Sequence, residues 1–289
     1  MNLDTFLAAA WSEHGENPQQ VADQMMSSLH LLTAPTDIVA FARLLTHIYG
    51  EHLGQWTMGV GMLNSLRSLS AYDGSADCEG AINRSVAALL YAGGDNSALL
   101  PLGDEDQVCA LAMVAAALAG RQDLTRALQA YSRALELADA GLPTGSPAVR
   151  ALAVGGNNLA ATLEERLDRD AAQTQGMIAA AEGALKYWKL AGTWLEEERA
   201  EYRLSRSLLQ AGRAQAAVDS GQRCVALCEL NQAPAFELFF GYAVLALARR
   251  AAGAADLFLV ARQQALNAFA SVPIEERQWC ESDLSELRG

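Results

Sequence analysis

A helix hairpin that recurs along the chain restricts its fold more than any other feature. In residues 111–138, two runs of apolar residues at helical spacing flank a turn at Gln122, and the second run places Ala127, Tyr131 and Ala134 on one face. Three further segments repeat this order: 41–69 with a turn at Gly54, 204–224 with a turn at Gly212, and 242–265 with a turn at Gly253. Because stacked hairpins bury one continuous core, the pattern predicts an all-α solenoid.

The rest of the chain fits the same helical class. Clusters of Gly, Pro, Ser and Asp separate segments whose apolar residues recur at helical spacing, with few β-branched residues. The composition is 51% hydrophobic and rich in Ala and Leu, which enter helices at little cost. We therefore expect roughly fourteen antiparallel helices and no strand. A length of 289 residues suggests two domains, but a stack of repeats can extend this far as one body, so we expect a single array.

The hairpins also share an order of small and large residues. In two copies a turn glycine lies five positions before the small residue of the second helix: Gly54 with Gly59, and Gly212 with Ala217. This order resembles the tetratricopeptide repeat (TPR) family. The segment Asn157-Asn158-Leu159-Ala160 is similar to the first helix of such a repeat, with its partner helix over 171–190. The resemblance covers most of the chain and implies a right-handed superhelix of antiparallel hairpins, in which the first helices line a concave groove.

By this resemblance, residues 1–289 form one TPR-like solenoid with three parts. Residues 1–37 form N-terminal helices that match the repeat poorly, and residues 38–273 hold the helix-hairpin repeats. Residues 274–289 form a C-terminal capping helix, which begins after Pro273 and alternates acidic and apolar positions. Such a segment suits a cap, because a terminal repeat hides one face and offers water the other.

The resemblance also implies a binding site where two successive first helices converge on the groove. The residues expected there are Asn157, Asn158, Arg199, Tyr202, Arg203 and Arg206. The three arginines stand at i, i+4 and i+7, so they share one helix face and repel each other by roughly 0.2–0.5 kcal/mol per like-charge pair. A counter-anion would relieve this repulsion. Asparagine suits the backbone of an extended peptide, while guanidinium groups suit carboxylates or phosphates. The predicted ligand is therefore a peptide segment with acidic side chains, a free C-terminus or a phosphate.

A second interpretation of the same helix stays open. Glu196, Glu197, Glu198 and Glu201 accompany the arginines, and Glu196 lies one turn from Arg199. Under this interpretation the residues form a solvated face of mixed charge with no ligand.

We expect no metal site and no cofactor. Cys224 and Cys228 lie one helical turn apart, but Cys224 falls on a stripe of small residues, where a cysteine packs as a small hydrophobe. His47 and His52 are five residues apart, which is not the i, i+4 spacing that brings two imidazoles together on an α-helix. We interpret them as ordinary structural or surface histidines.

Charge and cysteine usage exclude several classes of partner and location. A net charge of −13 argues against binding of nucleic acid or of anionic membranes. The five cysteines are odd in number and lack a framework spacing, which is typical of thiols in a reducing compartment. No basic residue precedes the short apolar stretch at the N-terminus, and the longest apolar run, 109–120, is too short to span a bilayer. We expect a cytoplasmic protein.

The sequence contains no nucleophile elbow, zinc-protease motif, Walker loop or dinucleotide fingerprint. We therefore expect a non-catalytic module that binds a protein or peptide segment in its groove. One alternative is an assembly protein that associates with its own copies while the groove stays idle. The other is an all-helical enzyme or a sensor of a small ligand, whose carboxylates would converge from distant helices.

Overall fold

The computed structural model describes residues 2–288, and within them every regular element is helical. There are fourteen α-helices and no strand in this part of the chain, which confirms the predicted all-α class. The chain divides into two compact units, Met1–Gly155 and Gly156–Gly289, and the boundary falls inside one helix. The expectation of a single array over 1–289, with its repeat part and its cap, stays a prediction.

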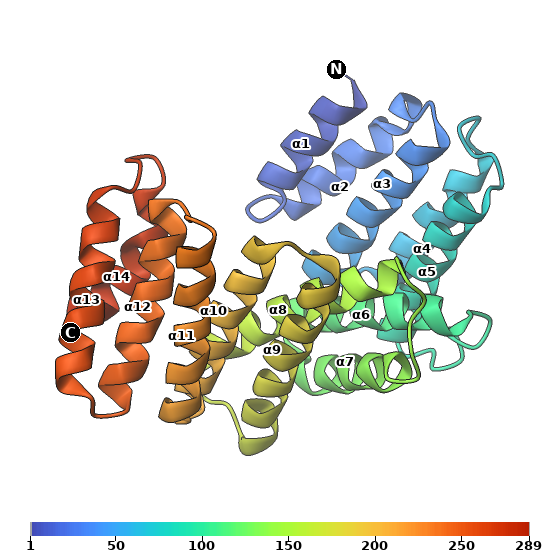
Figure 1. The fold of residues 1–289 in the computed structure, drawn as a ribbon. Coiled ribbons are helices and arrows are strands. Elements are labelled where there is room, and N and C mark those ends of the chain that lie inside the picture. The colour runs from blue at the N-terminus through green and yellow to red at the C-terminus, as the bar shows by residue number, and fades with distance from the viewer. Residues whose placement is uncertain (1, 289) are drawn as a thin grey trace. The chain divides into compact units, whose positions relative to one another are not determined.

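Unit 1 contains the first seven helices and the first half of the eighth (Figure 1). Its core is a cluster of buried apolar side chains that includes Phe6, Phe41 and Leu63. The elements are α1 (Leu3–Glu13), α2 (Pro18–Ser27), η1 (Leu29–Leu31), α3 (Pro35–Thr46), η2 (His47–His52), α4 (Trp56–Ser65), η3 (Leu66–Ser68), α5 (Ala76–Ala92), α6 (Asp104–Gly120), α7 (Leu124–Ala138) and α8 (Pro147–Glu164).

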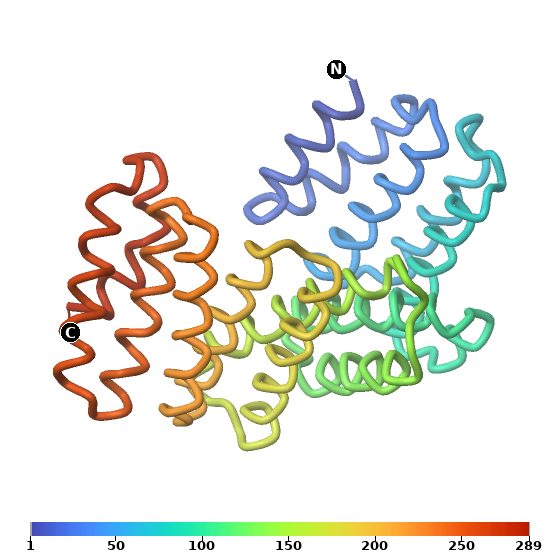
Figure 2. The backbone as a smooth tube through the Cα atoms, in the orientation of Figure 1, coloured from blue at the N-terminus to red at the C-terminus, as the bar shows by residue number. Residues whose placement is uncertain are grey.

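Unit 2 continues from the second half of α8, and consecutive helices from α10 to α13 lie side by side in alternating directions (Figure 2). The hairpins expected from the sequence are present: α10 pairs with α11, and α12 pairs with α13. The elements are α9 (Ala171–Ala191), α10 (Trp194–Gln210), α11 (Ala214–Leu230), α12 (Ala235–Ala251), α13 (Ala255–Ala270), η4 (Arg277–Cys280) and α14 (Glu281–Arg288).

The same turn closes most of the predicted hairpins. At Gly212 and Gly253 the backbone is left-handed, with φ of 70° and 75°, and Gln122 takes the same conformation with φ of 63°. After Gly212, the amide of Arg213 donates to the carbonyl of Leu208 at 2.8 Å. Equivalent bonds over five residues follow the other two turns. This pattern is the common C-terminal stop of an α-helix, and its recurrence explains why glycine could mark the turns in the sequence.

Small residues bring the helices close together, as the sequence predicts. A Cβ atom placed on Gly221 of α11 would lie 3.1 Å from the Cα atom of Leu245 on α12. A Cβ atom on Gly59 of α4 would lie 2.6 Å from a methyl carbon of Leu89 on α5. At both positions a larger residue would push two helices apart.

One element departs from α-helical geometry and could not be read from the spacing. After α3 the chain continues into a π-helix, η2, in which hydrogen bonds run from residue i to i−5. The amide of Leu53 donates to the carbonyl of Ile48 at 3.0 Å. Gly120 at the end of α6 approaches so closely that a Cβ atom there would lie 2.5 Å from the carbonyl oxygen of Glu51. The wider turn of η2 changes which side chains share a face.

None of the described helices combines the length and the apolar character needed to cross a membrane.

Candidate functional site

Helix α10 carries four of the six predicted site residues. Thr193 caps the N-terminus of α10, and the Glu196 carboxylate accepts from the Thr193 amide at 2.8 Å, which fixes where the helix begins. Arg199, Tyr202 and the two later arginines follow at helical spacing. Their side chains share a face, as predicted, but they reach three different neighbouring elements.

Arg203 reaches back to α8 and pairs with the carboxylate of Glu164. The same carboxylate accepts from the hydroxyl of Ser207 at 2.6 Å. The Glu164 side chain is only 9% exposed, and burial raises the pKa of its carboxyl group, although Arg203 acts in the opposite direction. The pair is therefore an interior ion pair in which each partner depends on the other.

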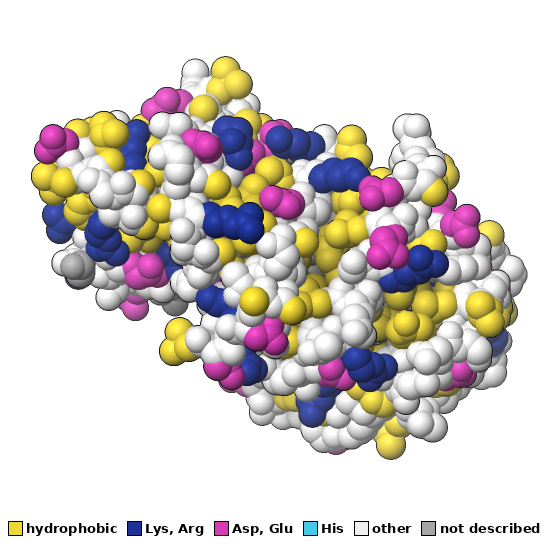
Figure 3. All heavy atoms as spheres, turned by 90° about the horizontal axis from the view of Figure 1, so that it is seen from below, with side chains coloured by type: hydrophobic (Ala, Val, Ile, Leu, Met, Phe, Trp, Pro, Cys, Tyr) yellow, Lys and Arg dark blue, Asp and Glu magenta, His cyan; other side chains and the backbone are white. Residues whose placement is uncertain are grey.

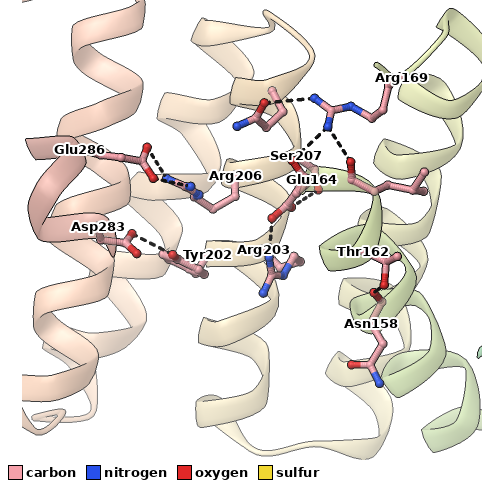
Figure 4. Close-up of polar contacts among 12 residues, drawn as sticks. Asn158, Thr162, Glu164, Arg169, Tyr202, Arg203, Arg206, Ser207, Asp283 and Glu286 are labelled. Atoms are coloured by element: carbon pink, nitrogen blue, oxygen red, sulfur yellow. Dashed lines mark hydrogen bonds and ion pairs between the residues drawn. The ribbon is translucent and has the colours of Figure 1, made fainter. Parts of the chain in front are cut away.

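Arg206 and Tyr202 reach the C-terminal helix α14 (Figure 4). The guanidinium of Arg206 donates to both carboxylate oxygens of Glu286, at 2.7 and 3.0 Å. The hydroxyl of Tyr202 donates to Asp283 at 2.8 Å. Burial, the largest single influence, lowers the pKa of the Arg206 guanidinium, but the bond to Glu286 and the neighbouring groups of Tyr202 and Asp283 together raise it above its usual value. Burial, then the neighbouring Asp283, raises the pKa of Tyr202 well above its usual value.

Arg199 turns toward α12, where it pairs with the carboxylate of Glu237. The Arg199 side chain is 57% exposed, whereas the Arg206 side chain is 16% exposed. The pair of Arg199 and Glu237 therefore joins an exposed guanidinium to a carboxylate that is only 8% exposed. Because water reaches the guanidinium, solvent screens this pair more than it screens the pair of Arg203 and Glu164.

The two predicted asparagines lie on α8. Asn157 is half-buried and Asn158 is exposed. The backbone carbonyl of Asn158 accepts from the hydroxyl of Thr162 at 3.0 Å (Figure 4). The binding role of all six predicted residues stays a prediction.

The sequence predicts that a ligand supplies the negative charge beside the three arginines. In the structure, carboxylates of the chain itself supply it. Glu164, Glu237 and Glu286 each pair with one of the three arginines. These partners lie 38 to 80 residues away from them, so their spacing in the sequence gives no sign of the pairing. On the face shown in Figure 3, Lys and Arg side chains likewise lie beside Asp and Glu side chains.

Helix α10 also carries a fully buried carboxyl group, that of Glu198. The predicted core position of Cys224 and Cys228 is confirmed, since both thiols are buried and unoxidised. The Cys224 thiol donates to one oxygen of Glu198 at 2.9 Å, while the other Glu198 oxygen is buried without a partner. Burial raises the pKa of Glu198 to about 7, with nearby Glu237 acting in the same direction.

An open pocket of about 250 Å³ lies between α10 and α11. The buried carboxylate of Glu201 is in its lining, where it accepts from Arg223 and from Ser220 at 2.8 and 2.9 Å. Because these polar groups already satisfy one another, the pocket offers a ligand few free hydrogen-bonding groups.

The prediction from spacing that His47 and His52 lie apart is wrong, whereas their interpretation as structural or surface histidines stays a prediction. The π-helix brings residues five apart onto one face, and their Nε2 atoms lie 3.1 Å from each other. His14, at the C-terminus of α1, joins them, with ring centroids 4.8 Å from His47 and 5.0 Å from His52. The sequence does not predict this cluster, because no residue pattern in it indicates a π-helix. The one available signal is that all four histidines of the chain lie in its first 52 residues.

Comparison with solved structures identifies the fold, whereas comparison by sequence finds no relative. No family model matches the chain, and none of the curated proteins matches it. The structure of BtubC (BKLC) from P. vanneervenii is similar over 93% of this chain and 92% of its own, with 15% identity and a TM-score of 0.50. A structure from Podosopora anserina, assigned as a kinesin light chain with nearly identical TPR-like repeats, covers 76% of this chain and 97% of its own, with 15% identity and a TM-score of 0.47. The predicted TPR-like helical-repeat fold is confirmed.

Proposed function

We propose that this chain is a non-catalytic protein-interaction module that binds an acidic segment of a partner protein. The binding surface is the face of α10 that carries Tyr202 and the three arginines, here called the α10 face. One observation carries the proposal. The acidic helix α14 of the chain itself lies against this face, with carboxylates on Tyr202 and Arg206. The chain thus already contains one example of the kind of ligand that this face accepts.

The contacts of α14 define the chemistry of the expected partner. Asp283 and Glu286 stand at i and i+3, so they share one side of the helix. Leu284 and Leu287 are buried beside them, at 7% and 1% exposure. A matching segment is helical, with two carboxylates three residues apart and leucine-like residues next to them. This ligand is a helical form of the acidic peptide that the sequence predicts.

Such a partner must displace α14. A helix of eight residues is barely stable by itself in water, so α14 holds its place through contacts with other helices and through its covalent attachment. Besides the side-chain contacts to α10, it packs against α12, and its last carbonyls accept from Arg250 and Arg262 at 2.9 Å. Attachment gives it an effective concentration in the millimolar range, against which a free peptide competes poorly. The face therefore binds a partner well only when the partner makes more contacts than α14 or when α14 is loosened.

The buried pair of Arg203 and Glu164 restricts the choice of test variant. Reversing the charge of all three arginines would leave Glu164 buried beside a new carboxylate, and the resulting instability would be mistaken for lost binding. Arg206→Gln removes the bonds to Glu286 of α14 and leaves the bonds of Glu164 to Arg203 and Ser207 in place.

Binding of a labelled peptide tests the proposal. The probe is a fluorescent peptide of residues 274–288, measured by anisotropy with three full-length proteins that circular dichroism shows to be folded. We expect the loosened variant Asp283→Asn, Glu286→Gln to bind at least about tenfold more tightly than the wild type, because its own α14 competes less. Adding Arg206→Gln to that variant should remove at least about tenfold of the gain. Equal affinity for all three proteins would refute the proposal.

A second candidate, assembly with other copies of the chain, rests on α13. Leu257, Leu259 and Val260 of this helix are 52–55% exposed. Exposed apolar residues gathered on one element are typical of association surfaces. Sedimentation of the wild type beside Leu259→Asp tests this candidate: a dimer that the substitution converts to a monomer supports it, and a wild-type monomer at all concentrations excludes it.

We also place the protein in the cytoplasm. The five cysteines are all free and buried, which suits a reducing compartment.

A further inference from the structure

Three of the four histidines in the chain meet at one point of unit 1. His14 ends α1, while His47 and His52 begin and end the π-helix η2. One ring nitrogen from each lies within 4.8 Å of those of the others, and all three side chains are half-buried. They are the one group of this kind among residues 2–288. Convergence of three imidazoles from two separate segments is not required by helix packing.

Hydrogen bonds fix how two of these rings face the common point. Nδ1 of His47 lies 2.7 Å from a carboxylate oxygen of Glu51, and Nδ1 of His14 lies 2.8 Å from the carbonyl oxygen of Trp11. Both partners only accept, so each Nδ1 carries the hydrogen. In the neutral ring, Nε2 then holds a lone pair, and the Nε2 atom of His47 lies 3.1 Å from that of His52. Carboxylate and carbonyl partners of this kind are what orient metal-binding histidines in proteins.

The spacing of the rings suits a small transition-metal ion. Zinc binds imidazole nitrogen at about 2.0–2.1 Å, so two nitrogens of a tetrahedral site lie about 3.3 Å apart. His47 and His52 already match this separation, and His14 needs a shift of about 1–1.5 Å, which small rotations of half-exposed side chains provide.

The surroundings contain charges of both signs. Glu51 favours a cation, while Arg121, whose guanidinium donates to the His52 carbonyl at 2.7 Å, opposes it. The Trp11 ring packs against both His14 and His47, with centroids at 5.4 and 5.0 Å. Trp11 thus covers one side of the cluster, whose three histidine side chains are half-buried.

We propose that His14, His47 and His52 form a binding site for a divalent late transition-metal ion, Zn²⁺ being the best fit, with water in the remaining position. Imidazole ligands favour zinc, copper and nickel over magnesium or calcium. The ion would join the end of α1 to η2 and so fasten the N-terminal helices of unit 1. This site lies in unit 1 and the proposed partner-binding face lies in unit 2, so either proposal can fail without the other.

Calorimetric titration of tag-free, full-length protein with ZnCl₂ tests the site. We expect one ion per chain with a Kd of about 10 μM or tighter. His14→Ala or His47→Ala should each weaken binding at least about tenfold, and Glu51→Gln, which touches no ion, by about tenfold or more through the orientation of His47. The matched control is His30→Ala, because His30 is the fourth histidine and its ring contacts only the Ser27 carbonyl, at 2.8 Å.

Cobalt supplies a second readout. Co²⁺ in place of Zn²⁺ should give the visible absorption of a nitrogen-ligated ion without a thiolate charge-transfer band, since the five cysteines are buried elsewhere. The proposal is overturned if the wild type binds no Zn²⁺, if binding survives in His14→Ala and His47→Ala, or if the cobalt spectrum shows thiolate ligation.

Discussion

The α10 face of unit 2 and the histidine cluster of unit 1 both bring nitrogen-bearing side chains together, but these side chains differ in the partners that the chain itself provides. In unit 2 each arginine has a carboxylate of the same chain: Glu237 for Arg199, Glu164 for Arg203 and Glu286 for Arg206. In unit 1, His14 and His47 use one nitrogen each on their own chain and direct the other toward a shared point. Arginines that pair with carboxylates of the same chain stabilise the fold. Histidine nitrogens whose lone pairs converge on one point can instead bind a cation.

The largest expected effect comes from breaking the interior pair of unit 2. Arg203→Gln leaves the Glu164 carboxylate buried without its cation, and loss of one partner from a buried pair typically costs about 3–5 kcal/mol. Because the Arg203 side chain is 25% exposed, we expect the free energy of unfolding to fall by about 2–4 kcal/mol. Urea unfolding at pH 7 measures this change. A loss below about 0.5 kcal/mol would show that the pair is not interior in solution.

The second effect concerns Glu198, a buried carboxyl group of unit 2 whose neighbour in the sequence, Arg199, pairs with Glu237 instead. Its pKa is about 7 in the folded chain against an ordinary 4.5, so between these values the folded state binds more protons than the unfolded state. The contribution of protonated Glu198 to the free energy of unfolding is therefore fully present below about pH 4.5. It declines as the pH rises to about 7.

Glu198→Gln should remove this decline. Relative to the wild type, the variant should gain roughly 2–3 kcal/mol in unfolding free energy between pH 4.5 and pH 8. The charged and titratable groups facing it are Cys224, Cys228, Glu237 and Arg199, which the substitution leaves in place. Urea unfolding of both proteins at several pH values gives the difference, and a constant difference across the range would contradict the assigned pKa.

A smaller effect tests how the fold shapes the histidine cluster. Gly120→Ala would place a Cβ atom 2.5 Å from the Glu51 carbonyl and push η2 away from α6. Overpacking of this kind costs about 1–3 kcal/mol. Because Glu51 orients His47, zinc affinity should also fall, although no ligand is changed. Gly61→Ala is the matched control, since nothing lies within 4 Å of its Cβ position. Equal zinc affinity in the two variants would show that the position of η2 does not affect zinc binding, which would contradict this prediction.

The smallest effect is expected at the exposed end of the α10 face. Arg199→Gln removes the cation from Glu237, which is 8% exposed, but the arginine itself is 57% exposed, so water can take its place and stability should fall by only about 1 kcal/mol. Glu237 and Glu164 are buried to a similar degree, so comparing this loss with that of Arg203→Gln in the same urea series shows whether burial of the arginine sets the strength of these pairs. Similar losses in both variants would argue against that view.

The sequence predicts more of the fold than of the site, for a physical reason. Turns at Gln122, Gly212 and Gly253 and the small residues of α11 act locally, so residue spacing reveals the hairpins. The α10 face also follows from spacing along a single helix. Its carboxylate partners depend on packing between elements up to 80 residues apart, which no local pattern records.

The histidine cluster shows the same limit more sharply. His47 and His52 share a face only because the backbone adopts i to i−5 hydrogen bonds, and His14 arrives from another helix. Spacing rules assume 3.6 residues per turn, so they assign the two histidines of η2 to different faces. A local change of helical period therefore hides a site from sequence reasoning even when its residues are close in the chain.

Amide hydrogen exchange of α14 in the full-length protein tests the central claim most directly, namely that α14 and a partner share the α10 face. The measurement follows residues 281–288 as the unlabelled peptide of residues 274–288 is added in excess, with an isotope label distinguishing the two copies. We expect exchange in the chain's own α14 to accelerate as peptide binds. Arg206→Gln should also speed this exchange without peptide, because the Glu286 carboxylate loses its partner. Peptide that binds while α14 stays fully protected would contradict the claim.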